Sequence, residues 1–179
     1  VSFSFLCAIQ TGLSNGYFLL GLPGNLNDLF QPAYNKGARV HANSWGANDA
    51  GAYTDNSAEA DQFIFNNPDM TITFSAGNSG EDGNGDGVVD NDSIGSPATA
   101  KNVITIGASE NDRPDDFPCD TSLSYTSGDN FQTGQTCSSM GGKNYLGTAG
   151  ERWGFTAEPL NSDLTAGNQE QMAPFSSRG

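Results

Sequence analysis

Apolar residues recur with two different periods along the first 110 residues. Two segments place them at helical spacing, residues 26–34 and residues 55–69. Four short segments are instead rich in β-branched and aromatic residues, which is typical of strands: residues 1–9, 38–46, 70–78 and 102–110. Strands that alternate with helices across short connections predict an α/β fold with a parallel sheet.

The periodic pattern ends near residue 111. Residues 111–171 are polar and rich in Gly, Ser and Thr, so we expect a long loop-rich insertion there. The closing residues 172–179, "MAPFSSRG", are expected to return to the core. The chain is therefore predicted to be one partial domain, with its parallel α/β core in residues 1–110.

Composition removes several classes of function. The chain has 21 acidic and 7 basic residues, a formal charge of −14, and nucleic-acid binding needs the opposite sign. No apolar run approaches the roughly 18 residues of a membrane span, so no membrane partner is expected. Residues 1–12 lack the positively charged residues with which a signal peptide begins, so we do not expect a signal peptide there.

The three cysteines form no CxxC pair, so a zinc site is not predicted. Cys119 and Cys137 lie in the same polar segment. A disulfide between them would close a surface loop, contribute about 3 kcal/mol and suit an extracellular protein. Two unpaired thiols are equally compatible with the sequence, whereas Cys7 lies in an apolar strand and is expected in the core.

An acidic, glycine-rich loop follows the third predicted strand. Oxygen ligands occupy positions one, three, five, seven and nine of its sequence "DGNGDGVVDND": Asp82, Asn84, Asp86, the carbonyl of Val88, and Asp90. That spacing, with glycine at position six, is the one by which a loop surrounds calcium. Ser93 replaces the acid expected at position twelve, and Asp92 falls one place early. The simpler interpretation is a solvated acidic loop, but so many close carboxylates repel one another without a cation.

The same strand ends in "SAGN". Gly77 permits a sharp turn, and Asn78 then offers a neutral amide donor at the carboxyl end of the strand. Such a donor can bind a ligand carbonyl or stabilise an oxyanion during acyl transfer. An asparagine that merely caps its own turn is the alternative, and this tetrapeptide alone favours the alternative.

Four longer segments occur in one order: "GARVHANSWG", "MTITFSAGNSG", "GSPATAKNVITIGASEN" and "FSSRG". Together they resemble the subtilisin-like serine proteases, the subtilases, from about residue 21 to residue 110 and again over the last eight residues. The resemblance is closest to the larger calcium-dependent bacterial members, in which similar acidic loops occur. It implies part of a doubly wound parallel sheet of the subtilisin-like type.

The resemblance also implies roles for single residues. Asn78 matches the oxyanion-hole asparagine, and two segments match the walls of the substrate groove. One wall is Ser44, Trp45 and Gly46, which would pair with an extended peptide through backbone hydrogen bonds, and the facing wall is Ser75, Ala76 and Gly77. The resemblance loosely implies a preference for large apolar or aromatic side chains in the pocket between them.

The catalytic triad of this family is not found. The chain contains no "HGT" and no "GTSM", and its one histidine, His41, lies in the middle of a predicted strand. We therefore expect a segment of a secreted, calcium-binding serine endopeptidase that is inactive alone. Its partners would be a peptide or protein substrate and either the missing parts of the protease domain or a second copy. The alternative is a non-catalytic, calcium-dependent module that binds peptides or proteins.

Overall fold

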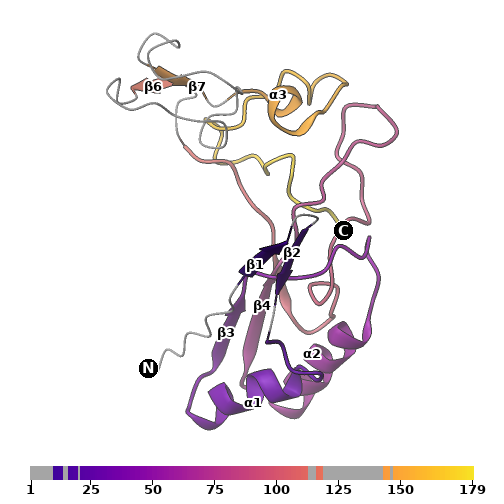
Figure 1. Cartoon of the computed structure of the whole chain (residues 1–179), viewed down its shortest axis with the longest axis vertical. Helices are drawn as coiled ribbons and strands as arrows, with labels where there is room; N and C mark the ends of the chain where they lie inside the picture. Colours follow the sequence, from indigo (N-terminus) through magenta and orange to yellow (C-terminus); the bar gives the residue numbers. More distant parts are fainter. Residues whose placement is uncertain (1–9, 14–15, 20, 113–115, 119–142, 146) are drawn as a thin grey trace. The chain divides into compact units, whose positions relative to one another are not determined.

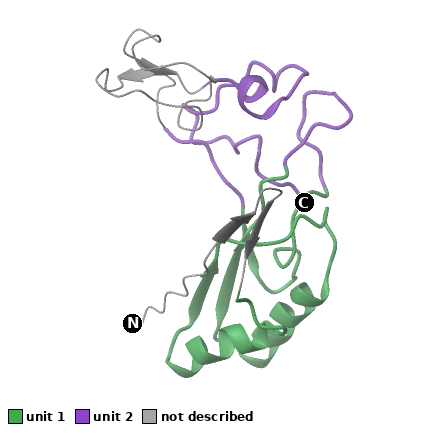
Figure 2. Cartoon of the chain, viewed as in Figure 1, with its two compact units in different colours: residues 1–79, 92–106, 179 green, residues 80–91, 107–178 purple. Residues whose placement is uncertain are grey.

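The computed structural model describes residues 10–13, 16–19, 21–112, 116–118, 143–145 and 147–179. The chain divides into two units, coloured separately in Figure 2. The first unit comprises residues 1–79, 92–106 and 179, and the second comprises residues 80–91 and 107–178. Each unit has its own core and is described by itself.

A parallel three-stranded sheet is the centre of the first unit (Figure 1). Its strands are β3 (Val40–Asn43), β4 (Thr71–Ser75) and β5 (Ile104–Ile106), with β4 in the middle. Asn43 lies opposite Phe74, and Ser75 lies opposite Ile106. The predicted α/β class and parallel sheet are confirmed, although each strand is shorter than its predicted segment.

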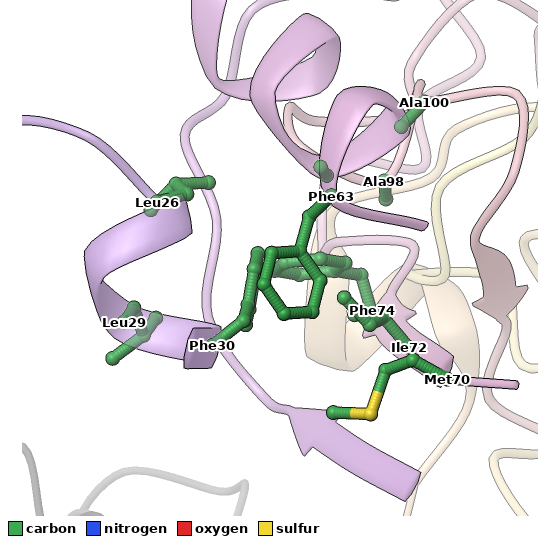
Figure 3. Close-up of a cluster of buried hydrophobic side chains, with 10 residues drawn as sticks. Leu26, Leu29, Phe30, Phe63, Met70, Ile72, Phe74, Ala98 and Ala100 are labelled. Carbon is green, nitrogen blue, oxygen red and sulfur yellow. The ribbon is translucent and has the colours of Figure 1, made fainter. Parts of the chain in front are cut away.

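Two helices pack on one face of this sheet, α1 (Asn27–Asn35) and α2 (Asp55–Asn66). Ile72 and Phe74 of β4 point to the same face because strand side chains alternate, and both are fully buried. The buried cluster drawn in Figure 3 joins the helices to that face: Leu26, Leu29, Phe30, Ala60, Phe63, Met70, Ile72, Phe74, Ala98 and Ala100. Both helices therefore cover a single side of the sheet.

The opposite face of the sheet is open among the described residues. Val40, Ile104 and Ile106 are 67%, 52% and 51% exposed. A parallel sheet is ordinarily covered on both faces. In the described part, the helices therefore cover one face of this sheet, and these side chains of the other face stay exposed.

Helix α1 ends at a glycine in the left-handed conformation. Gly37 adopts φ +93°, its N–H donates to the Tyr34 carbonyl at 2.9 Å, and the Ala38 N–H donates to the Ala33 carbonyl at 3.0 Å. These two bonds form a Schellman motif, which needs a left-handed residue at the position of Gly37. At the other end, the Glu59 carboxylate accepts a hydrogen bond from the Leu26 N–H at 2.8 Å, so α2 helps to fix the start of α1.

The first unit also contains an antiparallel hairpin that the sequence analysis did not predict. Its strands are β1 (Gln10–Leu13) and β2 (Gly16–Leu19). The strand predicted at residues 1–9 lies outside the described residues.

The second unit has little regular structure in its described part. Strands β6 (Asp116–Pro118) and β7 (Lys143–Tyr145) pair antiparallel, and the single short helix α3 spans Ala149–Trp153. Its core is a small cluster formed by Ala149, Phe155 and Leu160, with Val89 and Trp153 packed against it. Much of the insertion predicted at residues 111–171 lies outside the described residues, so the insertion stays a prediction. No helix in the described part is long and apolar enough to cross a membrane.

Candidate functional site

The carboxyl ends of β3 and β4 bring the two predicted substrate walls together. Because Asn43 pairs with Phe74 in parallel register, the residues that follow them leave the same edge of the sheet side by side. These residues are Ser44–Gly46 directly after β3 and Ser75–Gly77, which begin at the last residue of β4. Ligand sites in open α/β sheets lie at this edge.

The first wall is anchored by the Trp45 side chain. Its indole packs edge-on against Phe74 with centroids 5.2 Å apart, and its Nε1–H donates to Asn43 Oδ1 at 3.2 Å. Asn43 is only 5% exposed and also donates from Nδ2 to the Thr73 carbonyl at 3.1 Å. Sequence reasoning missed this positioning role of Asn43, whose signal is a polar residue at the end of a half-buried strand.

The backbone of the first wall is available for strand pairing. Outside the ladder of the sheet, Ser44, Trp45 and Gly46 form no backbone hydrogen bond with another described residue, and Ser44 and Gly46 are exposed. The next residue differs, because the Ala47 N–H donates to the Ser96 carbonyl at 2.8 Å. A side chain at position 46 would place its Cβ 2.9 Å from that carbonyl, so glycine allows the close approach.

The second wall is held by its middle residue. The Ala76 N–H donates to the Ile106 carbonyl at 2.8 Å, and the Ala76 carbonyl accepts from the Gly95 N–H at 3.0 Å. Gly77 follows with φ +112°, a conformation that side chains rarely adopt. The chain therefore turns sharply just before Asn78.

Residues 94–97 connect the two walls, a role that sequence reasoning missed. Ser96 pairs with Ala47 behind the first wall, while Gly95 donates to Ala76 in the second. A Cβ at position 95 would lie 2.2 Å from the Ala47 carbonyl. The sequence signal for this role was a pair of small residues, Gly95 and Ser96, directly before Pro97. Both small residues are buried in the structure.

Asn78 is exposed at the end of this turn. Its side chain forms no hydrogen bond with another residue in the described part of the chain. The simpler interpretation, that the amide caps its own turn, therefore finds no support in the structure. The Asn78 side-chain amide, which follows the fixed turn at Gly77, can therefore donate a hydrogen bond to a ligand oxygen.

His41 lies in the middle of β3 and is a packing residue. Its ring meets Phe30 edge-on with centroids 5.1 Å apart, and partial burial lowers its pKa. No other histidine occurs in the sequence, so this chain does not supply the general base of a serine triad from another position.

In the second unit, the acidic loop folds onto its own backbone. The two Asp82 carboxylate oxygens accept from the N–H groups of Asp86 and Gly87, each at 3.0 Å. Asn84 Oδ1 also accepts from the Asp86 N–H, at 2.9 Å, and Asp90 Oδ2 accepts from the Gly83 N–H at 2.7 Å. The side chains at positions one, three and nine thus all turn toward the loop's own N–H groups.

The fit of this loop to calcium is partial. Its donors are hard oxygens, and Gly87 adopts φ +81° at position six, where a sharp turn is needed. However, no three His, Cys, Asp or Glu side chains gather closely enough to hold a metal ion among the described residues. Asp92 belongs to the first unit, and Val88 is exposed. The calcium site therefore stays a prediction, and Cys119 and Cys137 lie outside the described residues.

Comparison with known proteins identifies the family to which this chain is similar. A family model described as "Subtilase family" matches residues 23–179. Three proteins of Dictyostelium discoideum, named serine protease/ABC transporter B family proteins tagD, tagB and tagA, are 40%, 34% and 30% identical to parts of the chain. The matches cover 49%, 49% and 56% of this chain. They span only 4% to 5% of the relatives' own lengths.

Proposed function

The chain belongs to the subtilase family, and we propose that it is an interior segment of a secreted serine endopeptidase. The segment would contribute the substrate walls and the oxyanion donor Asn78. The nucleophile, the general base and the acid that orients the base would come from other parts of the protein. Three relatives named as serine proteases support this proposal.

One observation carries the proposal: the two walls and Asn78 leave the same edge of one sheet. The unbonded backbone of Ser44–Gly46 can add an extended peptide as a further strand. The scissile carbonyl of that peptide would then lie near the end of β4. Asn78 would donate its amide hydrogen to the oxygen as negative charge develops on it.

Substitution of Asn78 tests the proposal in the full-length protein that contains this segment. Asn78→Ala should lower kcat by roughly two to three orders of magnitude and leave KM nearly unchanged, because the donor acts mainly in the transition state. Asn66→Ala, at the exposed end of α2, is the matched control and should keep wild-type rates. An unchanged kcat in Asn78→Ala would contradict the assignment.

We further propose that this chain is inactive alone and that its open sheet face binds either flanking parts of the domain or a second copy. The exposure of Val40, Ile104 and Ile106 supports such a partner. A fluorophosphonate should label no serine in the purified chain. Labelling with turnover would contradict the missing nucleophile, and a monomer in light scattering would rule out the second copy.

Calcium binding by residues 82–90 is part of the same proposal, as is an extracellular location where millimolar calcium is available. The loop's bonds from Asp82, Asn84 and Asp90 to its own N–H groups support it, since they pre-curve the loop. Calorimetric titration should show one site that Asp82→Ala and Asp86→Ala abolish. Asp28→Asn, in the first turn of α1, should not change it. Wild-type protein without a heat signal would leave only a solvated acidic loop.

A further inference from the structure

The acidic loop of the second unit contains a chemically reactive pattern that the proposed function does not use. Three consecutive pairs place a glycine directly after a side-chain carboxylate or amide: Asp82–Gly83, Asn84–Gly85 and Asp86–Gly87. In such a pair the glycine nitrogen can attack the side-chain carbonyl carbon before it and close a five-membered ring. Glycine favours the attack because it has no Cβ to hinder the approach. Which pair reacts then depends on the side-chain chemistry and on whether the glycine N–H is free.

The folded loop engages the glycine nitrogen of the first and third pairs. The Gly83 N–H donates to Asp90 Oδ2 at 2.7 Å, and the Gly87 N–H donates to Asp82 Oδ2 at 3.0 Å. Gly87 is also buried, and a Cβ there would overlap the Glu158 carbonyl. Both nitrogens would have to give up a hydrogen bond to a carboxylate before they could attack, and such charge-assisted bonds are strong ones.

The glycine of the middle pair is not engaged in this way. The Gly85 N–H forms no hydrogen bond with another residue in the described part of the chain. Asn84 and Gly85 are both exposed, and a Cβ at position 85 would meet nothing within 4 Å. The attacking nitrogen of this pair therefore has no bond to break and is open to the water that accepts its proton.

The Asn84 side chain is held in a way that favours attack on its carbonyl. Its Oδ1 accepts a hydrogen bond from the Asp86 N–H at 2.9 Å, and its Nδ2 donates to Asp86 Oδ2 at 3.2 Å. A donor on the carbonyl oxygen stabilises the negative charge that forms there when a nucleophile adds to the carbon. The carboxylates of the flanking pairs already carry negative charge and resist the same attack.

We propose that Asn84 is a self-modification site, at which the Gly85 nitrogen displaces the side-chain amide while the loop protects the two flanking pairs. A bond forms between the Gly85 nitrogen and Asn84 Cγ, and the Cγ–Nδ2 bond breaks. The amide leaves as ammonia, together with the proton that the Gly85 nitrogen loses. Water then opens the cyclic imide at either carbonyl, which gives aspartate or isoaspartate. Water is the sole co-reactant, and the inference does not depend on the proposed protease function.

The modification would permanently change the charge of the loop. It replaces the donor of the bond between Asn84 and Asp86 by a second carboxylate, and like charges so close together oppose the folded arrangement. Asn84→Asp, which reproduces one product, should therefore speed the hydrogen exchange of residues 80–91 at low salt with a chelator present. Added salt should slow the exchange again, since it screens the repulsion. Unchanged exchange at low salt would contradict this consequence.

The test follows all three pairs by mass spectrometry. The full-length protein that contains this segment is incubated at mildly alkaline pH, folded or in urea, and its peptides are fragmented to locate isoaspartate. Position 84 should convert in the folded protein, whereas Asp82 and Asp86 should isomerise only in urea. Asp86→Asn is the matched comparison: it creates a second Asn–Gly pair, and its amide oxygen still accepts from the Val88 N–H. In the folded variant this amide should react roughly 10- to 100-fold more slowly than Asn84, because its glycine nitrogen is bonded.

Two results would overturn the proposal. One is an Asn84 that stays intact in the folded protein although it reacts in urea, and the other is equal folded rates at both amides of Asp86→Asn. Asn84→Gln should abolish the conversion, because the ring would need a sixth member, and conversion that survived at this position would also overturn it. Asn15–Gly16 is a further pair of this kind in the sequence, and trypsin separates it from the loop after Lys36. Asn15 lies outside the described residues.

Discussion

The two units of the chain are stabilised by different kinds of interaction. In the first unit, ten buried residues from two helices, one strand and the adjoining loops form one continuous core (Figure 3). In the second, three buried residues form a small cluster, and the chain around it is mostly turns and isolated bridges. The first unit is held by apolar packing, whereas the second depends more on hydrogen bonds and glycine conformations.

The two units also differ in net charge. The second unit contains 14 of the 21 acidic residues and four of the seven basic ones, a formal charge of −10. The first unit carries the remaining −4. Concentrated like charge opposes a compact state. The second unit should therefore respond more strongly to salt and cations than the first.

The largest expected effect is the loss of a core aromatic ring from the first unit. Phe30 is fully buried and contacts the rings of His41, Phe63 and Phe74. Phe30→Ala should lower the free energy of unfolding by about 3–5 kcal/mol, since truncation removes buried area and leaves a cavity. Phe155→Ala in the smaller cluster should cost less.

Each unit contains one tryptophan, which makes this comparison measurable. Trp45 lies in the first unit and Trp153 in the second. Urea unfolding followed by fluorescence in Trp153→Phe reports the first unit, and Trp45→Phe reports the second. Equal losses at Phe30 and Phe155, or one shared transition for both reporters, would contradict the contrast between the units.

The first unit was the more predictable one because its geometry follows from periodicity. Leu29 and Phe30, then Ala60 and Phe63, recur at helical spacing and are buried as expected. Gly37 ends α1 in a left-handed turn, the usual role of a glycine directly after a helix. The β1–β2 hairpin was not foreseen, since its strands have neither a strong β-branched run nor a clear alternation.

A medium effect is expected at Gly87 in the second unit. A Cβ there would lie 1.9 Å from the Glu158 carbonyl, and φ is +81°. Gly87→Ala should destabilise the unit by roughly 1–3 kcal/mol, because strain at positive φ adds to the steric clash. Trp153 fluorescence during urea unfolding measures this loss.

Gly85→Ala is the matched control for that clash. Gly85 also has positive φ, +72°, but a Cβ there meets nothing within 4 Å. Its substitution should cost only the backbone strain, about 1 kcal/mol. If both alanine variants lost the same stability, the packing of Gly87 against Glu158 would not matter.

The sequence predicted those parts of the candidate site that follow directly from the order of the strands. The wall residues and Asn78 stand at strand ends, and parallel register predicts that strand ends meet. Asn43 and residues 94–97 were missed because their roles depend on contacts between distant segments, such as Ala47 with Ser96.

The smallest expected effect is a pH dependence confined to the first unit. Burial against Phe30 lowers the pKa of His41 in the folded state, so the unfolded chain binds more protons between the two pKa values. The stability contributed by neutral His41 is therefore complete above the unfolded value of about 6.5. It is lost progressively as pH falls from there toward the lower folded value.

His41→Leu should remove this slope, since leucine keeps an apolar contact with Phe30 and does not titrate. Urea unfolding reported by Trp45 between pH 7.5 and 5 measures the difference between wild type and variant. The Trp153 reporter gives the comparison within one molecule, because the second unit contains no histidine. An identical pH slope in wild type and His41→Leu would show that carboxylates, rather than the ring beside Phe30, set the acid sensitivity of the first unit.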